Sequence, residues 1–123
     1  MTASMFEITK TASFEAAHVL PLGPDESPYR RMHGHSFRVE ATVRGEADPS
    51  AGWVLDLADL DQALGAAAQS LDHGLLNDKP GLETPTLERL CLYFAGQLRP
   101  AFPGLSRIVV SRPSVGESCA LSL

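Results

Sequence analysis

The sequence predicts a single domain of the α+β class, with an antiparallel sheet and two helices in the order ββααββ. Residues 35–43 alternate between apolar and polar side chains, which is the period of a strand with one buried face. Residues 57–71 and 87–98 repeat their apolar side chains at the three- and four-residue spacing of amphipathic helices. Extended segments flank the two helices, and 123 residues suit one domain, covering residues 1–123, better than two.

The strands are predicted from alternation and from the turn residues between them. The first is expected over about Phe6–Phe14, with His18 at its end. A loop rich in proline and glycine then leads to the second strand at residues 35–43. The last two strands are expected at about residues 105–111 and 115–121.

The two helices are predicted from their caps as well as from their apolar stripes. The first is expected to begin after Asp56, a good N-cap residue, and to reach Leu71. The second is expected to begin at Thr84 and Pro85, because threonine caps helices and proline fits the first helical position. Pro100 ends it.

Composition excludes several classes of protein. Fifteen acidic against ten basic residues give a net charge of −5, which argues against a general nucleic-acid binder. No apolar run reaches the roughly 18 residues of a membrane span, and no signal peptide is visible in residues 1–10. Cys91 and Cys119 show no paired spacing, so a reduced, cytoplasmic setting is expected.

Three histidines form the first candidate site. His33 and His35 share one face of the second strand, and a hairpin return would place His18 beside them. Three neutral imidazoles with one open position are the ligands of a catalytic zinc ion. Histidines are also common as surface or core residues without a ligand, so the spacing alone leaves both interpretations open.

Asp72 and His73 form the second candidate site, at the expected C-terminal end of the first helix. A carboxylate beside an imidazole is suited to general acid–base catalysis. The helix dipole would favour the protonated imidazole there, and a histidine that only neutralises this dipole is the alternative interpretation.

Five motifs occur in a fixed order along the chain, namely Phe14–His18, His33–Phe37, Gly52–Asp56, Leu71–Asn77 and Thr84–Glu88. In this order they resemble the 6-pyruvoyl-tetrahydropterin synthase and 6-carboxytetrahydropterin synthase family. The resemblance runs from about Phe6 to about Arg112, which is most of the chain.

The resemblance implies a T-fold, in which a four-stranded antiparallel sheet carries two helices on one face. It implies that sheets join between subunits into a barrel and that two trimers form a hexamer, which agrees with the hazard of open sheet edges. It also implies that His18, His33 and His35 bind Zn²⁺ as a Lewis acid for a pterin side chain. Dihydroneopterin triphosphate would be the substrate, and Asp72 and His73 would match the proton-transfer pair.

The sequence departs from the family pattern at two positions. The family cysteine that acts as a base is replaced by Tyr29, and a phenol with a pKa near ~10 is a poorer base than a thiol near ~8.5. Glu26 or Asp25, in the same loop, could serve instead.

At the second position, Arg112 replaces the family glutamate that grips the pterin ring. Arginine only donates hydrogen bonds, whereas this edge of the ring presents N–H donors, so Arg112 suits a carboxylate or phosphate better. Glu117 could replace the glutamate if the turn is rebuilt, or it could pair internally with Arg112.

Three hypotheses follow for the function. The first is a zinc-dependent lyase or aldol-type enzyme for an acidic small molecule that bears a hydroxyl or carbonyl group, and it predicts little activity on dihydroneopterin triphosphate. The second is a genuine tetrahydropterin synthase with an altered base. The third is a non-catalytic zinc-binding module. The presence of Asp72 and His73, a pair suited to proton transfer, argues against this third hypothesis. The lost ring-gripping carboxylate speaks against the second, so the first is preferred.

Overall fold

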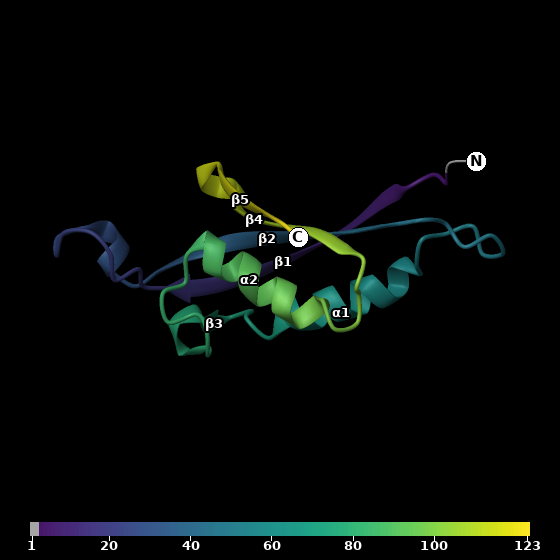
Figure 1. Ribbon diagram of the computed structural model, residues 1–123. Coiled ribbons are helices and arrows are strands. Elements are labelled where there is room, and N and C mark those ends of the chain that lie inside the picture. Colours follow the sequence, from purple (N-terminus) through teal and green to yellow (C-terminus); the bar gives the residue numbers. More distant parts are fainter. Residues whose placement is uncertain (1–2) are drawn as a thin grey trace.

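A long hairpin runs the length of the molecule. In the computed structural model, which describes residues 3–123, β1 (Phe6–His18) and β2 (His33–Gly45) pair antiparallel over all thirteen residues of each strand. The hairpin extends past the helices at both of its ends (Figure 1). The loop at residues 19–32 therefore lies at one end of the molecule, and the loop at residues 46–56 lies at the other.

Three further strands complete the sheet, in the spatial order β3-β1-β2-β4-β5. β4 (Leu105–Arg112) pairs antiparallel with β2, and β5 (Glu117–Ser122) pairs antiparallel with β4. These strands and β1–β2 confirm the predicted α+β class and antiparallel sheet. The structure adds β3 (Gly74–Leu75), a two-residue strand parallel to β1, which is too short to produce a periodic pattern.

Both helices lie on one face of the sheet, as Figure 1 shows. α1 (Leu57–Gln69) begins where predicted, because the Asp56 side chain accepts a hydrogen bond from the Ala58 amide at 2.9 Å. Its last residue precedes the predicted end at Leu71 by two positions. Neither helix of the described chain is long and apolar enough to cross a membrane.

α2 (Leu87–Leu98) begins later than predicted, with Thr86 and not Thr84 as its N-cap. The Thr86 hydroxyl accepts a hydrogen bond from the Arg89 amide at 3.2 Å. Pro85 lies before the helix, and its carbonyl oxygen faces His18 Nδ1 at 3.3 Å. Residues 84 and 85 therefore precede the helix, and Pro85 lies against the end of β1.

The core lies between the helices and the sheet face that they cover. Phe14 and Phe37 stack with ring centroids 5.0 Å apart, and Phe94 from α2 packs on Phe14 at 5.7 Å. The opposite face is polar, as shown by the hydroxyl pair Thr9 and Thr42 at 2.7 Å. β5 begins at Glu117 and not at residue 115, because residues 113–115 form a short 3₁₀ turn.

Candidate metal centre and proton-transfer pair

The three histidines predicted as metal ligands meet at one end of the hairpin. His18 is the last residue of β1 and lies opposite His33, the first residue of β2. His35 lies two residues further on the same face. One ring nitrogen from each histidine lies within 4.8 Å of the other two, so the structure brings together all three predicted ligands.

The hydrogen bonds of the rings indicate which nitrogens are free to bind a metal. His18 Nδ1 faces the Pro85 carbonyl at 3.3 Å, and His33 Nδ1 faces the Arg31 carbonyl at 2.7 Å. A carbonyl only accepts, so both Nδ1 atoms must donate, which leaves the Nε2 lone pairs free. These two Nε2 atoms are 2.9 Å apart. Facing lone pairs at this distance repel unless a cation lies between them, and the donor set therefore fits a zinc ion.

Burial favours the neutral form of two of these histidines, because it lowers the pKa of His18 and of His35. His18 is fully buried, and loss of water lowers its pKa from 6.5 to about 4. The pKa of His35 is also lowered, first by burial and then by the Arg112 guanidinium. Metal binding competes with protons for the ring nitrogens, so both shifts favour a metal at neutral pH.

Asn77 is a positioning residue whose contacts cannot be predicted from the sequence. Its Oδ1 accepts from the Val19 amide at 2.9 Å, and its Nδ2 donates to the Val19 carbonyl at 2.8 Å. Nδ2 also lies 3.3 Å from the Glu83 carbonyl. Asn77 thus ties the end of β1, next to His18, to the segment that leads into α2. Its place in an ordered motif was the available signal.

Asp72 and His73 are in contact, but not at a helix end as predicted. They lie beyond the last residue of α1, in the turn to β3, where Asp72 Oδ2 accepts from His73 Nδ1 at 2.7 Å. Asp72 Oδ1 accepts from the Glu15 amide at 2.8 Å, and the His73 amide donates to the Glu15 carbonyl at 2.6 Å. The Glu15 amide first, and His73 second, lower the pKa of Asp72. β1 therefore orients the pair, in place of the helix dipole.

His73 has a strained backbone and an accessible ring. Its φ is +57°, in the left-handed region that non-glycine residues seldom adopt. Its side chain is 80% exposed and hydrogen-bonds to Asp72. Within residues 3–123, no hydrogen bond joins it to the three clustered histidines.

The proposed bases lie in the loop between β1 and β2. Tyr29 belongs to a 3₁₀ turn (Pro28–Arg30), and its carbonyl accepts from the Leu20 amide at 2.8 Å. Tyr29 is 57% exposed, and Glu26 is exposed as well. Among the described residues, neither side chain is hydrogen-bonded to the histidines.

Arg112 and Glu117, the proposed substrate-binding residues, face each other across the β4–β5 hairpin. Arg112 Nε lies 3.0 Å from Glu117 Oε1. This is the internal pair that the sequence left open. Both residues line a pocket at the start of α2.

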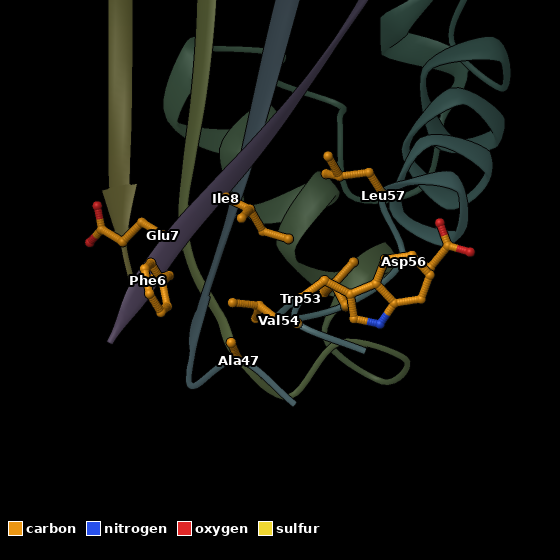
Figure 2. A pocket seen from close by; sticks show the side chains of 10 residues that line it. Phe6, Glu7, Ile8, Ala47, Trp53, Val54, Asp56 and Leu57 are labelled. Carbon is orange, nitrogen blue, oxygen red and sulfur yellow. The ribbon is translucent and has the colours of Figure 1, made fainter. Parts of the chain in front are cut away.

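A different pocket, of about 520 Å³, lies at the opposite end of the hairpin. Figure 2 shows Ile8, Trp53 and Val54 in its wall, with the Glu7 carboxylate turned away. Its lining is almost entirely apolar, and the Asp56 carboxylate is occupied in capping α1. None of the residues that line this pocket is a histidine of the candidate metal centre, so it is not part of that site.

The lowered pKa of His18 predicts that the metal-free protein loses stability in mild acid. His18 takes up a proton near pH 6.5 in the unfolded chain but only near pH 4 in the folded chain. The stability that neutral His18 contributes is therefore complete above pH 6.5 and is lost as the pH falls from 6.5 to about 4. Urea unfolding with a chelator should give about 2 kcal/mol less stability at about pH 5 than at about pH 7. His18→Gln should reduce this slope. An unchanged slope in that variant would contradict the assignment.

The positive φ of His73 predicts an unusual order of stabilities. His73→Gly removes the strain along with the ring, whereas His73→Ala removes only the ring. Thermal unfolding should therefore show the glycine variant to be more stable than the alanine variant, by about 1 kcal/mol. An alanine variant of equal or greater stability would show that the backbone is not strained there.

Several known proteins resemble this chain. A sequence model described as 6-pyruvoyl tetrahydropterin synthase matches residues 7–121. A 6-carboxy-5,6,7,8-tetrahydropterin synthase of Synechocystis sp. is 39% identical over 86% of this chain and 85% of its own. A human 6-pyruvoyl tetrahydrobiopterin synthase is 39% identical over 79% and 77% of the two chains. A dihydroneopterin monophosphate aldolase of Pyrococcus furiosus is 32% identical over 76% and 75%.

The fold is shared with solved structures as well. The Caenorhabditis elegans 6-pyruvoyl tetrahydropterin synthase superposes with a TM-score of 0.86, at 23% identity, over 100% of this chain and 99% of that one. The matching sheet and helices agree with the T-fold that the motifs implied. The sequence and structural matches together show that this chain belongs to the 6-pyruvoyl tetrahydropterin synthase family.

Proposed function

We propose that this protein is a zinc-dependent lyase that acts on the side chain of a 6-substituted pterin, as a 6-carboxytetrahydropterin synthase. The observation that carries the proposal is the convergence of His18 and His33, whose free Nε2 atoms are 2.9 Å apart. The relative from Synechocystis, named for this activity, supports the choice of substrate.

This proposal reverses the preference that Tyr29 and Arg112 suggested at the level of the sequence. That preference assumed that no carboxylate of the protein faces the pterin ring of the substrate and that Arg112 is free to bind an acidic substrate. In the structure, Glu117 lies 3.0 Å from the Arg112 guanidinium. A neighbouring anion already offsets the charge of Arg112, so an acidic substrate is no longer required.

The metal centre would bind the substrate side chain at the end of the hairpin. His18, His33 and His35 would hold the zinc ion, and Phe37 supports His35 with ring centroids 5.6 Å apart. When bound, zinc would polarise a hydroxyl or carbonyl oxygen of the substrate. The carbonyl partners of His18 and His33 keep these two ligands oriented without a change of tautomer.

Proton transfer is assigned to His73, with Asp72 as its positioning residue. The Asp72 carboxylate fixes Nδ1 as the protonated nitrogen, so Nε2 is the atom that accepts or donates a proton at the substrate. Glu26 is the preferred second base in the loop, because a carboxylate accepts a proton at neutral pH more readily than a phenol such as Tyr29. An ordered acid–base pair of this kind is not needed by a non-catalytic zinc module.

We further propose that the enzyme is a homohexamer and that its two sites combine between subunits. β5 leaves one sheet edge open, and β1 before residue 16 leaves the other open. The exposed His73 lies on the β1 side, in the turn before β3, where a neighbouring sheet would approach. Joining the edges would remove the aggregation hazard and would bring His73 to a second chain.

The substrate proposal predicts turnover of dihydroneopterin triphosphate by the zinc-loaded protein. Chromatography with fluorescence detection should show a tetrahydropterin product, formed at a rate ordinary for enzymes, about 1–10³ s⁻¹. His33→Ala should lose most of the bound zinc and the activity while keeping its circular dichroism spectrum. Retro-aldol products alone would favour the aldolase activity named for the Pyrococcus relative. No turnover of any pterin would overturn the proposal.

The assembly proposal predicts complementation between two inactive variants. His33→Ala lacks the metal centre and His73→Gly lacks the proton-transfer group, so each should be inactive alone. Mixed oligomers, refolded together, should regain part of the activity, because some sites receive both intact groups. Sedimentation as a 13.2 kDa monomer at micromolar concentration would contradict the assembly.

A further inference from the structure

The two cysteines of the chain meet where α2 packs on β5. Cys91 belongs to the buried side of α2, and its Sγ lies 3.4 Å from the carbonyl oxygen of Cys119, the third residue of β5. Cys119 packs against the hydrophobic core, so its side chain lies on the face of the sheet that α2 covers. Twenty-eight positions separate the two cysteines along the chain, and only tertiary packing brings them together.

The two thiols differ in reactivity because their surroundings differ. Cys91 is buried, and burial first, with the neighbouring Cys119 second, raises the pKa of its thiol to about 12. Such a thiol is almost never ionised at neutral pH, and the thiolate is the form that reacts with oxidants. Cys119 is partly exposed and lines the pocket of about 550 Å³ at the start of α2. A small oxidant can therefore reach Cys119 through this pocket but does not react with Cys91 directly.

A buried cysteine is often only a small apolar residue of the core, and Cys91 alone would need no other role. Two neighbouring free thiols, of which one is accessible, are the arrangement that a reversible disulfide requires. Cys91 Sγ already contacts the backbone of Cys119. Rotation of the two side chains, without separation of α2 from the sheet, would bring the sulfur atoms into bonding distance.

We propose that Cys119 is a peroxide-reactive thiol that forms a reversible disulfide with Cys91. The Cys119 thiolate attacks one oxygen of a hydroperoxide, the O–O bond breaks, and the leaving oxygen takes up a proton, which leaves a sulfenic acid on Cys119. The Cys91 sulfur then displaces the hydroxyl group of this sulfenic acid. The thiol proton of Cys91 leaves with the hydroxyl group as water, and the peroxide has gained the two electrons that the thiols lost. A reducing thiol reverses the reaction by exchange.

The disulfide would connect the two walls of the pocket at the start of α2. Leu87 and Glu88 line it from the helix, one turn before Cys91, and Glu117 lines it from β5, two residues before Cys119. Oxidation would therefore fix the spacing between α2 and β5, whereas the reduced protein holds it by packing alone. This inference goes beyond the proposed function, and it does not depend on which substrate the protein uses.

The test is to treat the zinc-loaded protein with hydrogen peroxide, block the remaining free thiols and identify the tryptic peptides by mass spectrometry without reduction. Trypsin leaves the two cysteines in separate peptides, residues 90–107 and 108–123, because Arg99 and Arg112 both precede proline. The two peptides should appear as one linked species that has lost two hydrogen atoms. Dithiothreitol should restore the separate peptides.

Two variants separate the roles of the cysteines. In Cys119→Ser, Cys91 should react with peroxide at least about 10-fold more slowly than Cys119 does in wild-type protein. In Cys91→Ala, the sulfenic acid on Cys119 should persist long enough to be captured by a 1,3-dione reagent. Circular dichroism and zinc content verify that each variant is intact. The linked peptide of the wild-type protein remains a test if either variant fails to fold.

Thermal unfolding shows whether the native packing suits the disulfide. Peroxide should raise the unfolding midpoint of wild-type protein by about 5 °C, dithiothreitol should reverse the rise, and neither variant should show it. A lowered midpoint in the linked protein would show that the bond distorts the contact between α2 and β5, against the proposal.

The remaining outcomes are equally decisive. Sulfinic acid on Cys119 with Cys91 unmodified, or a link between the Cys119 residues of two chains, would overturn the pairing. Thiols that stay reduced at a peroxide concentration that oxidises free cysteine would overturn the proposal as a whole. No measurement here uses a pterin, so these results and the turnover of dihydroneopterin triphosphate can fail independently.

Discussion

The register of the β1–β2 hairpin is the constraint on which the rest of the molecule depends. Because side chains alternate along a strand, a slip of one residue would turn His18 to the polar face while His33 and His35 stayed on the other. The stacked rings of Phe14 and Phe37 hold this register, since they pair across the same two strands and are buried under α2. One hydrophobic contact in the core thus aligns the candidate metal ligands above it.

The residues around the histidines convert this alignment into a site with defined chemistry. The carbonyl groups of Arg31 and Pro85 set the tautomers of His33 and His18. Pro85 can do so only because α2 begins after it, and Asn77 holds the end of β1 against this segment. The start of α2, the end of β1 and the candidate metal centre are therefore one coupled unit. Ligand orientation of this kind is normally supplied by such outer contacts.

The two departures from the family pattern have different structural consequences. Tyr29 stands on an exposed loop, where Glu26 is the proposed base in place of the lost thiol. Arg112 instead stands opposite Glu117, so a change on β4 is matched by a carboxylate on β5. The replacement of the family cysteine by Tyr29 affects proton transfer, and other groups of the same loop can accept a proton. The second concerns the shape and polarity of a pocket, where a cross-strand partner can restore the balance of donors and acceptors.

The sequence by itself determined the elements, and the tertiary structure decided their contacts. Alternation and apolar stripes located β1, β2, α1 and α2, and the spacing of His33 and His35 predicted a shared face, because these features depend on neighbours along the chain. The choice of Thr86 over Thr84 as a cap, the strand β3 and the strained φ of His73 depend on contacts with the distant end of β1. The pairing of Arg112 with Glu117 likewise required the turn between them. Local patterns carry no information on such partners, since long-range contacts form only when the sheet and helices pack.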